Sequence, residues 1–361
     1  MAPDPAPRKP SDRSTGAVTL QQVATRAGVS IATASRALHG GHGRVVNEEL
    51  RSRVLAAAAE LSYVSNAPAQ ALARSRTSVV GLLVHDVADP YFGAIATGVM
   101  RAAAEFDLMV MLAASFREPQ LELDYLVRLR TQRARAIVLA GSGFTDQAFT
   151  ARLGESLAGF AEDGGRVVCV GDHGVDTDTV NLDNRDGAEQ AVAHLWALGH
   201  RRIGVIAGPL GLVTVRDRLD GVRRALQRRG AELPADCLVE ADFTRAGGHA
   251  AALALFARRP DLTAVFALND GMAAGALAAL QEGLGRSVPG EVSVVGFDDL
   301  PYSADLHPSL TTVRLPLRRA GQRALELIVD ERPQRGARRI VELEADLTVR
   351  ASTGPAPAHS G

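Results

Sequence analysis

Residues 19–36, TLQQVATRAGVSIATASR, determine the fold of the N-terminal part of the chain. Thr19 and Gln22 have the spacing of a capping box, in which the hydroxyl accepts from a free backbone N–H and the amide bonds back. Gly28 permits a sharp turn after this first helix, and Ser30 can cap a second one. Two short helices joined by a tight turn form a helix-turn-helix, whose second helix enters the DNA major groove N-terminus first.

These residues resemble the LacI/GalR family of bacterial transcription regulators. The family pattern T-[LI]-x-D-V-A-x-x-A-G-V-S-x-x-T-V-S-R is departed from only at Gln22 and Ala34, which we interpret as helix-start and packing variants. The resemblance continues through residues 46–72 and covers nearly everything from Val18 to Ser352.

The resemblance implies which head residues contact DNA. Ile31, Ala32 and Arg36 occupy the positions that touch base edges in the family. Arg36 can form a bidentate contact with guanine, whereas Ile31 and Ala32 offer only apolar contact, for instance to a thymine methyl. The other DNA-binding residues predicted in this head are Thr19, Ser30, Thr33, Ser35 and His39, and the last four suit phosphates.

Residues 65–78 are predicted to form a hinge helix and linker. Asn66 can cap a short helix that carries Pro68 in its first turn. By the resemblance, such helices fold on the operator, and a leucine, here Leu72, wedges into a central CpG step of the minor groove. Asn66, Ala69 and Leu72 are therefore predicted DNA contacts, and a plain interdomain linker is the alternative.

Composition and charge limit the class of protein. The 361 residues are 46% hydrophobic, and no apolar run reaches the 18 residues typical of a membrane span. Residues 1–16 read as a disordered leader without the apolar segment of a signal peptide, so we expect a soluble, cytoplasmic protein. Residues 1–78 carry a net charge of +5 and the remainder −6, which makes the head the polyanion binder. Cys169 and Cys237 are expected to be reduced core residues, without metal-ligand spacing.

After residue 78 the pattern changes to short apolar runs that alternate with helical stretches. Such continuous runs indicate parallel sheets covered on both faces. The runs are residues 79–84, 108–113, 136–140, 167–170, 203–207, 264–268 and 292–297. The predicted fold class is an N-terminal all-α helix-turn-helix head plus an α/β core that resembles periplasmic binding proteins, with two Rossmann-like lobes.

The predicted domain boundaries follow from this. The head spans residues 17–64, and the effector-binding and dimerisation domain spans residues 79–352. The first lobe takes residues 79–172 and 315–336, and the second takes residues 173–314 and 337–352, including a strand at 340–343. Residues 353–361 are predicted to be a disordered tail without leucine heptads, so a homodimer is expected on a pseudo-palindromic operator with a central CG.

In open α/β sheets, ligands bind at the carboxyl ends of the strands. By the resemblance, the residues there hold a small effector, with Tyr91, Phe92 and Phe243 as apolar walls. Arg216 and Asp298 would grip polar groups by charge-assisted bonds, while Arg218 either joins them or braces the loop. The other predicted effector-binding residues are Asp172, Thr214 and Asn269.

Aromatic plates beside Asp, Asn and Arg suit a sugar, whose ring face stacks while its hydroxyls both donate and accept. Leu212 stands where purine-repressor relatives carry an Arg, which disfavours a purine. The sequence therefore predicts a regulator, in particular a repressor of a carbohydrate-utilisation operon. A nucleoside- or purine-responsive regulator, or one controlled by a protein partner, remains the alternative.

A sugar-processing enzyme is the remote alternative. The chain contains no complete dinucleotide-binding loop, phosphate loop, Gly-x-Ser-x-Gly elbow or HExxH-type spacing. An exported sugar-binding protein would need a signal peptide and no helix-turn-helix. We therefore predict no catalytic residues, no cofactor, no metal site and no membrane partner.

Overall fold

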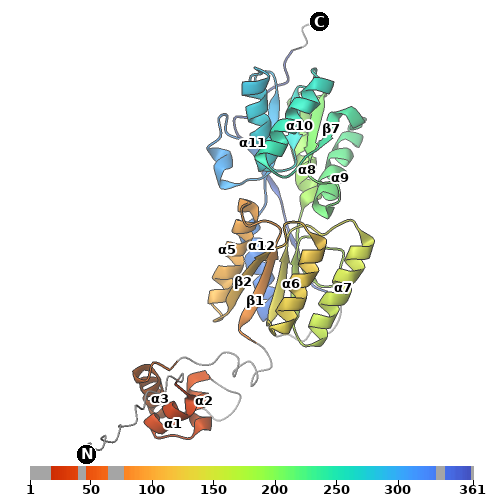
Figure 1. The fold of residues 1–361 in the computed structure, drawn as a ribbon. Helices are drawn as coiled ribbons and strands as arrows, with labels where there is room; N and C mark the ends of the chain where they lie inside the picture. The colour runs from red at the N-terminus through yellow and green to blue at the C-terminus, as the bar shows by residue number, and fades with distance from the viewer. Residues whose placement is uncertain (1–17, 40–45, 64–76, 331–337, 359–361) are drawn as a thin grey trace, which may run out of the picture. The chain divides into compact units, whose positions relative to one another are not determined.

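The computed structural model describes residues 18–39, 46–63, 77–330 and 338–358. The chain divides into two compact units, residues 1–77 and residues 78–361. Figure 1 labels the elements of both. Among the described helices, none has the length and apolar character needed to cross a membrane.

The first unit is the head, in which three helices are described. Its helices are α1 (Leu20–Ala27), α2 (Ile31–His39) and α3 (Glu48–Glu60). The predicted capping box is confirmed, because the Thr19 hydroxyl accepts from Gln22 N and the Gln22 side chain accepts from Thr19 N at 2.7 Å. Gly28 ends α1 in the left-handed region at φ 65°, a conformation that glycine adopts without steric cost. Small side chains from all three helices make a buried core, including Val23, Ala34 and Val54.

The first lobe is built on a six-stranded sheet in the order β11-β5-β4-β3-β1-β2. Its strands, all parallel, are β1 (Val79–Val84), β2 (Met109–Ala114), β3 (Ala136–Ala140), β4 (Arg166–Val170), β5 (Asp178–Leu182) and β11 (Ile340–Leu343). Successive residues point to opposite faces, so Val80 and Leu82 join one hydrophobic cluster and Leu83 joins another. Four helices cover the two faces: α5 (Pro90–Ala104) with α12 (Leu317–Val329), and α6 (Pro119–Thr131) with α7 (Gln147–Glu162).

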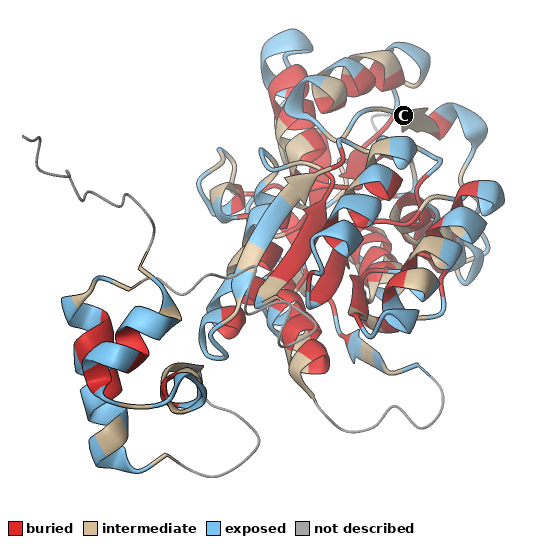
Figure 2. Cartoon of the chain, turned by 60° about the horizontal axis from the view of Figure 1, so that its bottom comes forward, coloured by how far each residue is buried: buried red, intermediate tan, exposed pale blue. Residues whose placement is uncertain are grey.

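The second lobe repeats the plan with the strand order β12-β10-β9-β8-β6-β7. Its strands are β6 (Ile203–Ala207), β7 (Leu238–Glu240), β8 (Ala264–Ala267), β9 (Ser293–Asp298), β10 (Thr311–Arg314) and β12 (Asp346–Thr348), of which β12 is antiparallel. The helices are α8 (Asn184–Ala197), α9 (Val213–Gln227), α10 (Arg245–Arg258) and α11 (Asp270–Ala278), with a π-helical segment at Ala279–Gly283 and short 3₁₀ turns at Ala235–Cys237 and Pro301–Ala304. Figure 2 shows the buried residues gathered on the strands and on the inner faces of the helices.

The lobe boundaries need two corrections. Strand β5 stays in the first lobe, because Val168 pairs with Asp178 and Val170 with Val180, so the chain crosses after Leu182 and not after Asp172. Strand β11 also belongs to the first lobe and not, as predicted, to the second, because Ile340–Leu343 pairs with β5. Arg339 fixes this register by donating from Nε to Asp178 Oδ2 at 3.0 Å.

The predicted disordered tail also needs correction. Residues 353–358 are described, and the first of them are hydrogen-bonded to the second lobe. Gly354 N donates to Ser293 Oγ at 3.1 Å, and Ala356 N donates to Leu198 O at 2.8 Å. These bonds satisfy backbone groups that a disordered tail would leave to water.

Candidate DNA-binding head and interlobe cleft

The second helix of the head presents the predicted base-reading residues to solvent. Ser30 caps α2 by accepting from Thr33 N at 3.1 Å. Ile31 is 46% exposed, although it is among the most apolar side chains of the head. Arg36 is exposed and its Nε donates to Ala32 O at 3.0 Å, so it lies along its own helix. An exposed isoleucine on this helix suits a surface that a partner covers.

The remaining predicted DNA contacts divide into two groups. The Thr19 side chain takes part in the capping box, and Ser35 is half-buried. Asn66, Ala69 and Leu72, together with the leader at residues 1–16, lie outside the described residues.

The lobes enclose a cleft, here called the interlobe cleft, with an empty volume of about 390 Å³. Strand ends and helix starts of both lobes line it, as the position of ligands in α/β folds predicts. The lining residues are His85, Asp89, Tyr91, Phe92, Arg117, Gly141, Ser142, Leu212, Thr214, Arg218, Phe243, Asn269 and Asp298.

Aromatic side chains form two walls of the cleft. Tyr91 and Phe92 lie in the first turn of α5, which Asp89 caps by accepting from Tyr91 N. Their rings are 5.0 Å apart and edge-on. Phe243 comes from the loop before α10 in the second lobe, and the Arg117 guanidinium of the first lobe lies 5.5 Å from its ring centre. Aromatic faces from opposite lobes can hold a flat apolar ligand face between them.

A buried ion pair sits at the base of the cleft. Arg218 Nη2 donates to Asp298 Oδ1 at 2.9 Å, and the two side chains are 3% and 4% exposed. Arg218 Nε donates to Asn184 Oδ1 at 2.9 Å, and its guanidinium lies 3.8 Å from the Phe297 ring centre. Burial raises the pKa of the Asp298 carboxyl, and the positive charge of Arg218 opposes that rise. Arg218 therefore orients Asp298, whose second oxygen remains to accept from a ligand.

The backbone at Asp298 and the cap at Asn269 fix the positions of two polar side chains of the cleft. Asp298 has φ 111°, a backbone conformation that side chains rarely adopt and that costs about 1–3 kcal/mol. Asn269 caps α11 by accepting from Met272 N at 2.7 Å. Because its oxygen is used in this way, its N–H groups remain as donors for the cleft.

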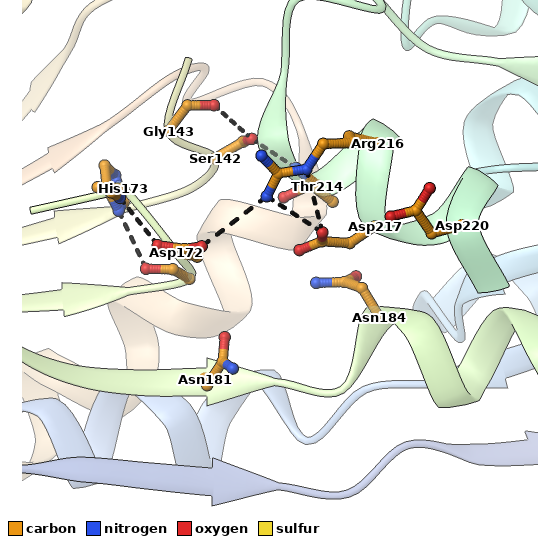
Figure 3. Close-up of polar contacts among 12 residues, drawn as sticks. Ser142, Gly143, Asp172, His173, Asn181, Asn184, Thr214, Arg216, Asp217 and Asp220 are labelled. Carbon is orange, nitrogen blue, oxygen red and sulfur yellow. Dashed lines mark hydrogen bonds and ion pairs between the residues drawn. The ribbon is translucent and has the colours of Figure 1, made fainter. Parts of the chain in front are cut away.

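Asp172 and Arg216 are not among the residues that line the cleft. Each side chain is 49% exposed, and Arg216 Nη2 lies 4.0 Å from Asp172 Oδ2 and 3.2 Å from Asp217 Oδ1 (Figure 3). The helix explains the difference from the prediction: the buried side of α9 includes Val215, Arg218 and Val222, so Arg216 points away from it. Arg218, for which the sequence left open a ligand contact or a bracing role, is paired with Asp298.

Two segments join the lobes at an edge of the cleft, and we call them the interlobe bridge: residues 142–145 and residues 211–214. Phe144 and Leu212 form an isolated antiparallel β-bridge. Hydrogen bonds run from Val213 N to Gly143 O and from Thr145 N to Gly211 O, each 2.9 Å long. A third bond of 2.9 Å runs from Thr214 N to Ser142 Oγ (Figure 3). Because residues of this bridge also line the cleft, a change in the relative orientation of the lobes would move the cleft walls.

The structure brings six of the eight predicted effector-binding residues to the cleft: Tyr91, Phe92, Thr214, Phe243, Asn269 and Asp298. Sequence reasoning missed His85, Arg117 and Ser142. His85 directly follows the first apolar run, and its place at a strand end could have identified it as a cleft residue. No group of three or more His, Cys, Asp or Glu residues in the described part of the chain is arranged to hold a metal ion.

Comparison with known proteins identifies the family. Residues 19–66 match the profile of the bacterial regulatory proteins of the lacI family, and residues 192–353 match a periplasmic binding protein-like domain. The HTH-type transcriptional regulator GalS of Salmonella typhimurium is 35% identical over 319 residues, which cover 86% of this chain and 88% of GalS.

Two solved structures resemble the chain over nearly its whole length. The complex of the transcriptional regulator CelR with cellobiose has a TM-score of 0.69 at 33% identity, covering 93% of this chain and 99% of CelR. The lac repressor dimer bound to operator and the anti-inducer ONPF has a TM-score of 0.81 at 26% identity, covering 94% and 100%. These proteins are regulators and not enzymes. The head, the two-lobe core and these relatives together show that the chain belongs to the LacI family of DNA-binding transcriptional regulators.

Proposed function

We propose that this protein is a homodimeric repressor of a carbohydrate-utilisation operon, acting in the cytoplasm, and that a sugar in the interlobe cleft sets its affinity for the operator. The observation that carries the proposal is the lining of the cleft, in which aromatic faces from both lobes accompany fixed polar groups. Tyr91, Phe92 and Phe243 supply the stacking faces. Asp298, Asn269 and Thr214 supply acceptors and donors for hydroxyls.

The relative orientation of the two lobes couples sugar binding to DNA binding. A sugar that contacts both lobes favours the orientation to which it binds more tightly. The equilibrium between two orientations shifts only by the difference in the sugar's affinity for them. Residues 65–78 connect the first lobe to the head, so we propose that lobe orientation controls whether paired hinge helices place Leu72 in a central CG step. The solved lac repressor dimer on its operator supports this reading by analogy.

The sugar half of the proposal is tested by ligand binding. D-glucose, D-galactose, D-ribose and cellobiose are screened by thermal shift and the hit is titrated by calorimetry. A ligand at 100 times its Kd stabilises the folded state by about 2.7 kcal/mol. Asp298→Asn should weaken the hit at least tenfold, whereas Asp305→Asn, an exposed carboxylate of the same lobe, should leave it unchanged. Absence of any hit, or equal effects of both variants, contradicts the proposal.

The DNA half is tested on an operator that the protein itself selects from random duplexes. Arg36→Ala should lose about 1–3 kcal/mol of discrimination at one guanine per half-site. Arg101→Ala, an exposed arginine on α5, serves as the control. An equal loss on all sequences would make Arg36 a phosphate contact.

A further inference from the structure

A histidine and a glutamate are buried side by side beneath the interlobe cleft. His85 follows β1 and Glu122 lies in the first turn of α6, and each residue is 3% exposed. His85 Nε2 is 3.8 Å from Glu122 Oε2. Neither residue belongs to the capping, ion-pair or bridge contacts described above, yet His85 is part of the cleft lining.

Both side chains have polar atoms without a partner. Glu122 Oε1 is buried and makes no hydrogen bond within the described residues. No described residue forms a hydrogen bond with the ring nitrogens of His85, whose ring lies among Phe92 at 5.7 Å and Phe144 at 5.9 Å. Buried polar atoms normally have a hydrogen-bond partner, and Glu122 Oε1 is one of the few buried side-chain atoms among the described residues that has none.

The two ring nitrogens of His85 face different neighbours. Nε2 lies on the side of Glu122. On the Nδ1 side, Gly141 packs closely, since a Cβ there would lie 3.2 Å from Nδ1. Because His85 and Gly141 both line the cleft, Nδ1 is the nitrogen on the side of the cleft.

We propose that His85 and Glu122 form a polar subsite in the floor of the interlobe cleft, in which the His85 ring donates a hydrogen bond to an oxygen of the bound sugar. Glu122 is the positioning residue: its protonated carboxyl donates to Nε2, which places the ring proton on Nδ1, towards the cleft. The two side chains need to approach by about 1 Å to form this bond. This inference rests on the proposed sugar-binding function.

The charges around the pair agree with this arrangement. Burial, followed by the nearby Arg117 and His173, lowers the pKa of His85 to about 3, so the ring is neutral. Burial raises the pKa of Glu122 to about 7, against a hydrogen bond from Ser115. Cys169, whose thiol pKa burial raises to about 12, faces Glu122 from β4 and stays protonated. Glu122 is thus the member of this cluster that changes charge near neutral pH.

The subsite predicts how binding depends on pH. A sugar expels water from the cleft, which disfavours the charged form of Glu122 further and favours uptake of a proton. Because the complex then binds more protons than the free protein, sugar affinity should fall as pH rises from 6 to 8. The uptake is measured at pH 7 by calorimetry in two buffers of different ionisation enthalpy.

The test uses the full chain and the sugar, among D-glucose, D-galactose, D-ribose and cellobiose, that binds it. His85→Phe keeps the ring packing against Phe92 and Phe144 but removes both nitrogens, and should weaken binding about tenfold. His249→Phe, a ring exchange on α10 outside the cleft, should change it less than twofold. Glu122→Gln, whose amide still donates to Nε2, should bind within about threefold of wild type, without proton uptake or pH dependence.

Three results would overturn the inference: unchanged affinity in His85→Phe, equal weakening in His249→Phe, or proton uptake in Glu122→Gln equal to that of wild type. Circular dichroism checks that each variant is folded, and His85→Leu, which also lacks a donor, replaces His85→Phe if the latter does not fold, with the same expectation. If the folded wild type binds none of the four sugars, the proposed function itself fails and this subsite with it.

Discussion

Two arginines on α9, only two residues apart, should differ sharply in what they contribute to stability. Arg218 is 3% exposed and paired with Asp298, whereas Arg216 is 49% exposed. Arg218→Met leaves a buried carboxylate unpaired and should cost about 3–5 kcal/mol. Arg216→Ala should cost at most about 1 kcal/mol, because water screens exposed ion pairs. Urea unfolding of both variants measures the two values, and similar losses would contradict the assigned environments.

Glu122 should make stability fall as pH rises. Its pKa is raised to about 7 in the folded protein, compared with about 4.3 in the unfolded chain. The folded state therefore holds the extra proton between these values, and about 3 kcal/mol should be lost as pH rises from about 5 to about 8. Glu122→Gln should remove this part of the slope, whereas Glu118→Gln, exposed just before the same helix, should keep it. A wild-type slope in the Glu122 variant would show that other groups cause the loss.

At individual positions, sequence reasoning identified the residue types of the cleft better than their orientations. Strand-end placement was enough for Tyr91, Asn269 and Asp298. It failed for Arg216, although helical spacing from Val215 and Val222 marked Arg218 as the buried arginine. The same spacing with Leu126 and Leu129 marked Glu122 as buried. Which buried charge meets which partner depends on contacts between distant segments, and local periodicity does not carry that information.

Among the elements, the crossing of α5 and α12 depends on glycine. A Cβ on Gly98 would lie 2.0 Å from Arg318 O, and one on Gly321 would lie 2.1 Å from Ile95 O. Gly98→Ala should therefore separate the helices and cost about 1–3 kcal/mol or more. Because α5 begins with the aromatic wall of the cleft, the same change should weaken sugar binding.

Gly93 provides the matched control on the same helix. No atom lies within 4 Å of a Cβ built there. Gly93→Ala should therefore stabilise the protein by about 0.5–1 kcal/mol, because alanine loses less backbone entropy in a helix. Thermal unfolding measures the stability of the Gly98→Ala and Gly93→Ala variants. Equal destabilisation by both would refute the close helix crossing.

Strands that read as continuous apolar runs were predictable, and the others were not. All seven predicted runs correspond to strands, because a strand buried on both faces needs apolar residues throughout. Strand β5 alternates polar and apolar residues, and β7, β10 and β12 are short, so none gave such a run. For β11 the run was seen but its lobe was wrong, because its partner β5 lies about 160 residues away.

In the whole molecule, three chain crossings and the interlobe bridge connect the two lobes of the second unit. The crossings lie between β5 and α8, between β10 and α12, and between β11 and β12. The sequence predicted the fold class correctly because repeated strand and helix units have few alternative arrangements. The crossings bring aromatic and polar side chains of both lobes to the same cleft.

The most direct test of the account is the affinity of the full-length protein for its selected operator, measured by fluorescence anisotropy at fixed salt with and without the sugar that binds it. Couplings between sites typically change affinity 5- to 150-fold. We predict that saturating sugar weakens operator binding at least tenfold in wild type, and has little effect on Asp298→Asn at the same concentration. An operator affinity that stays the same while the cleft is saturated would contradict the account.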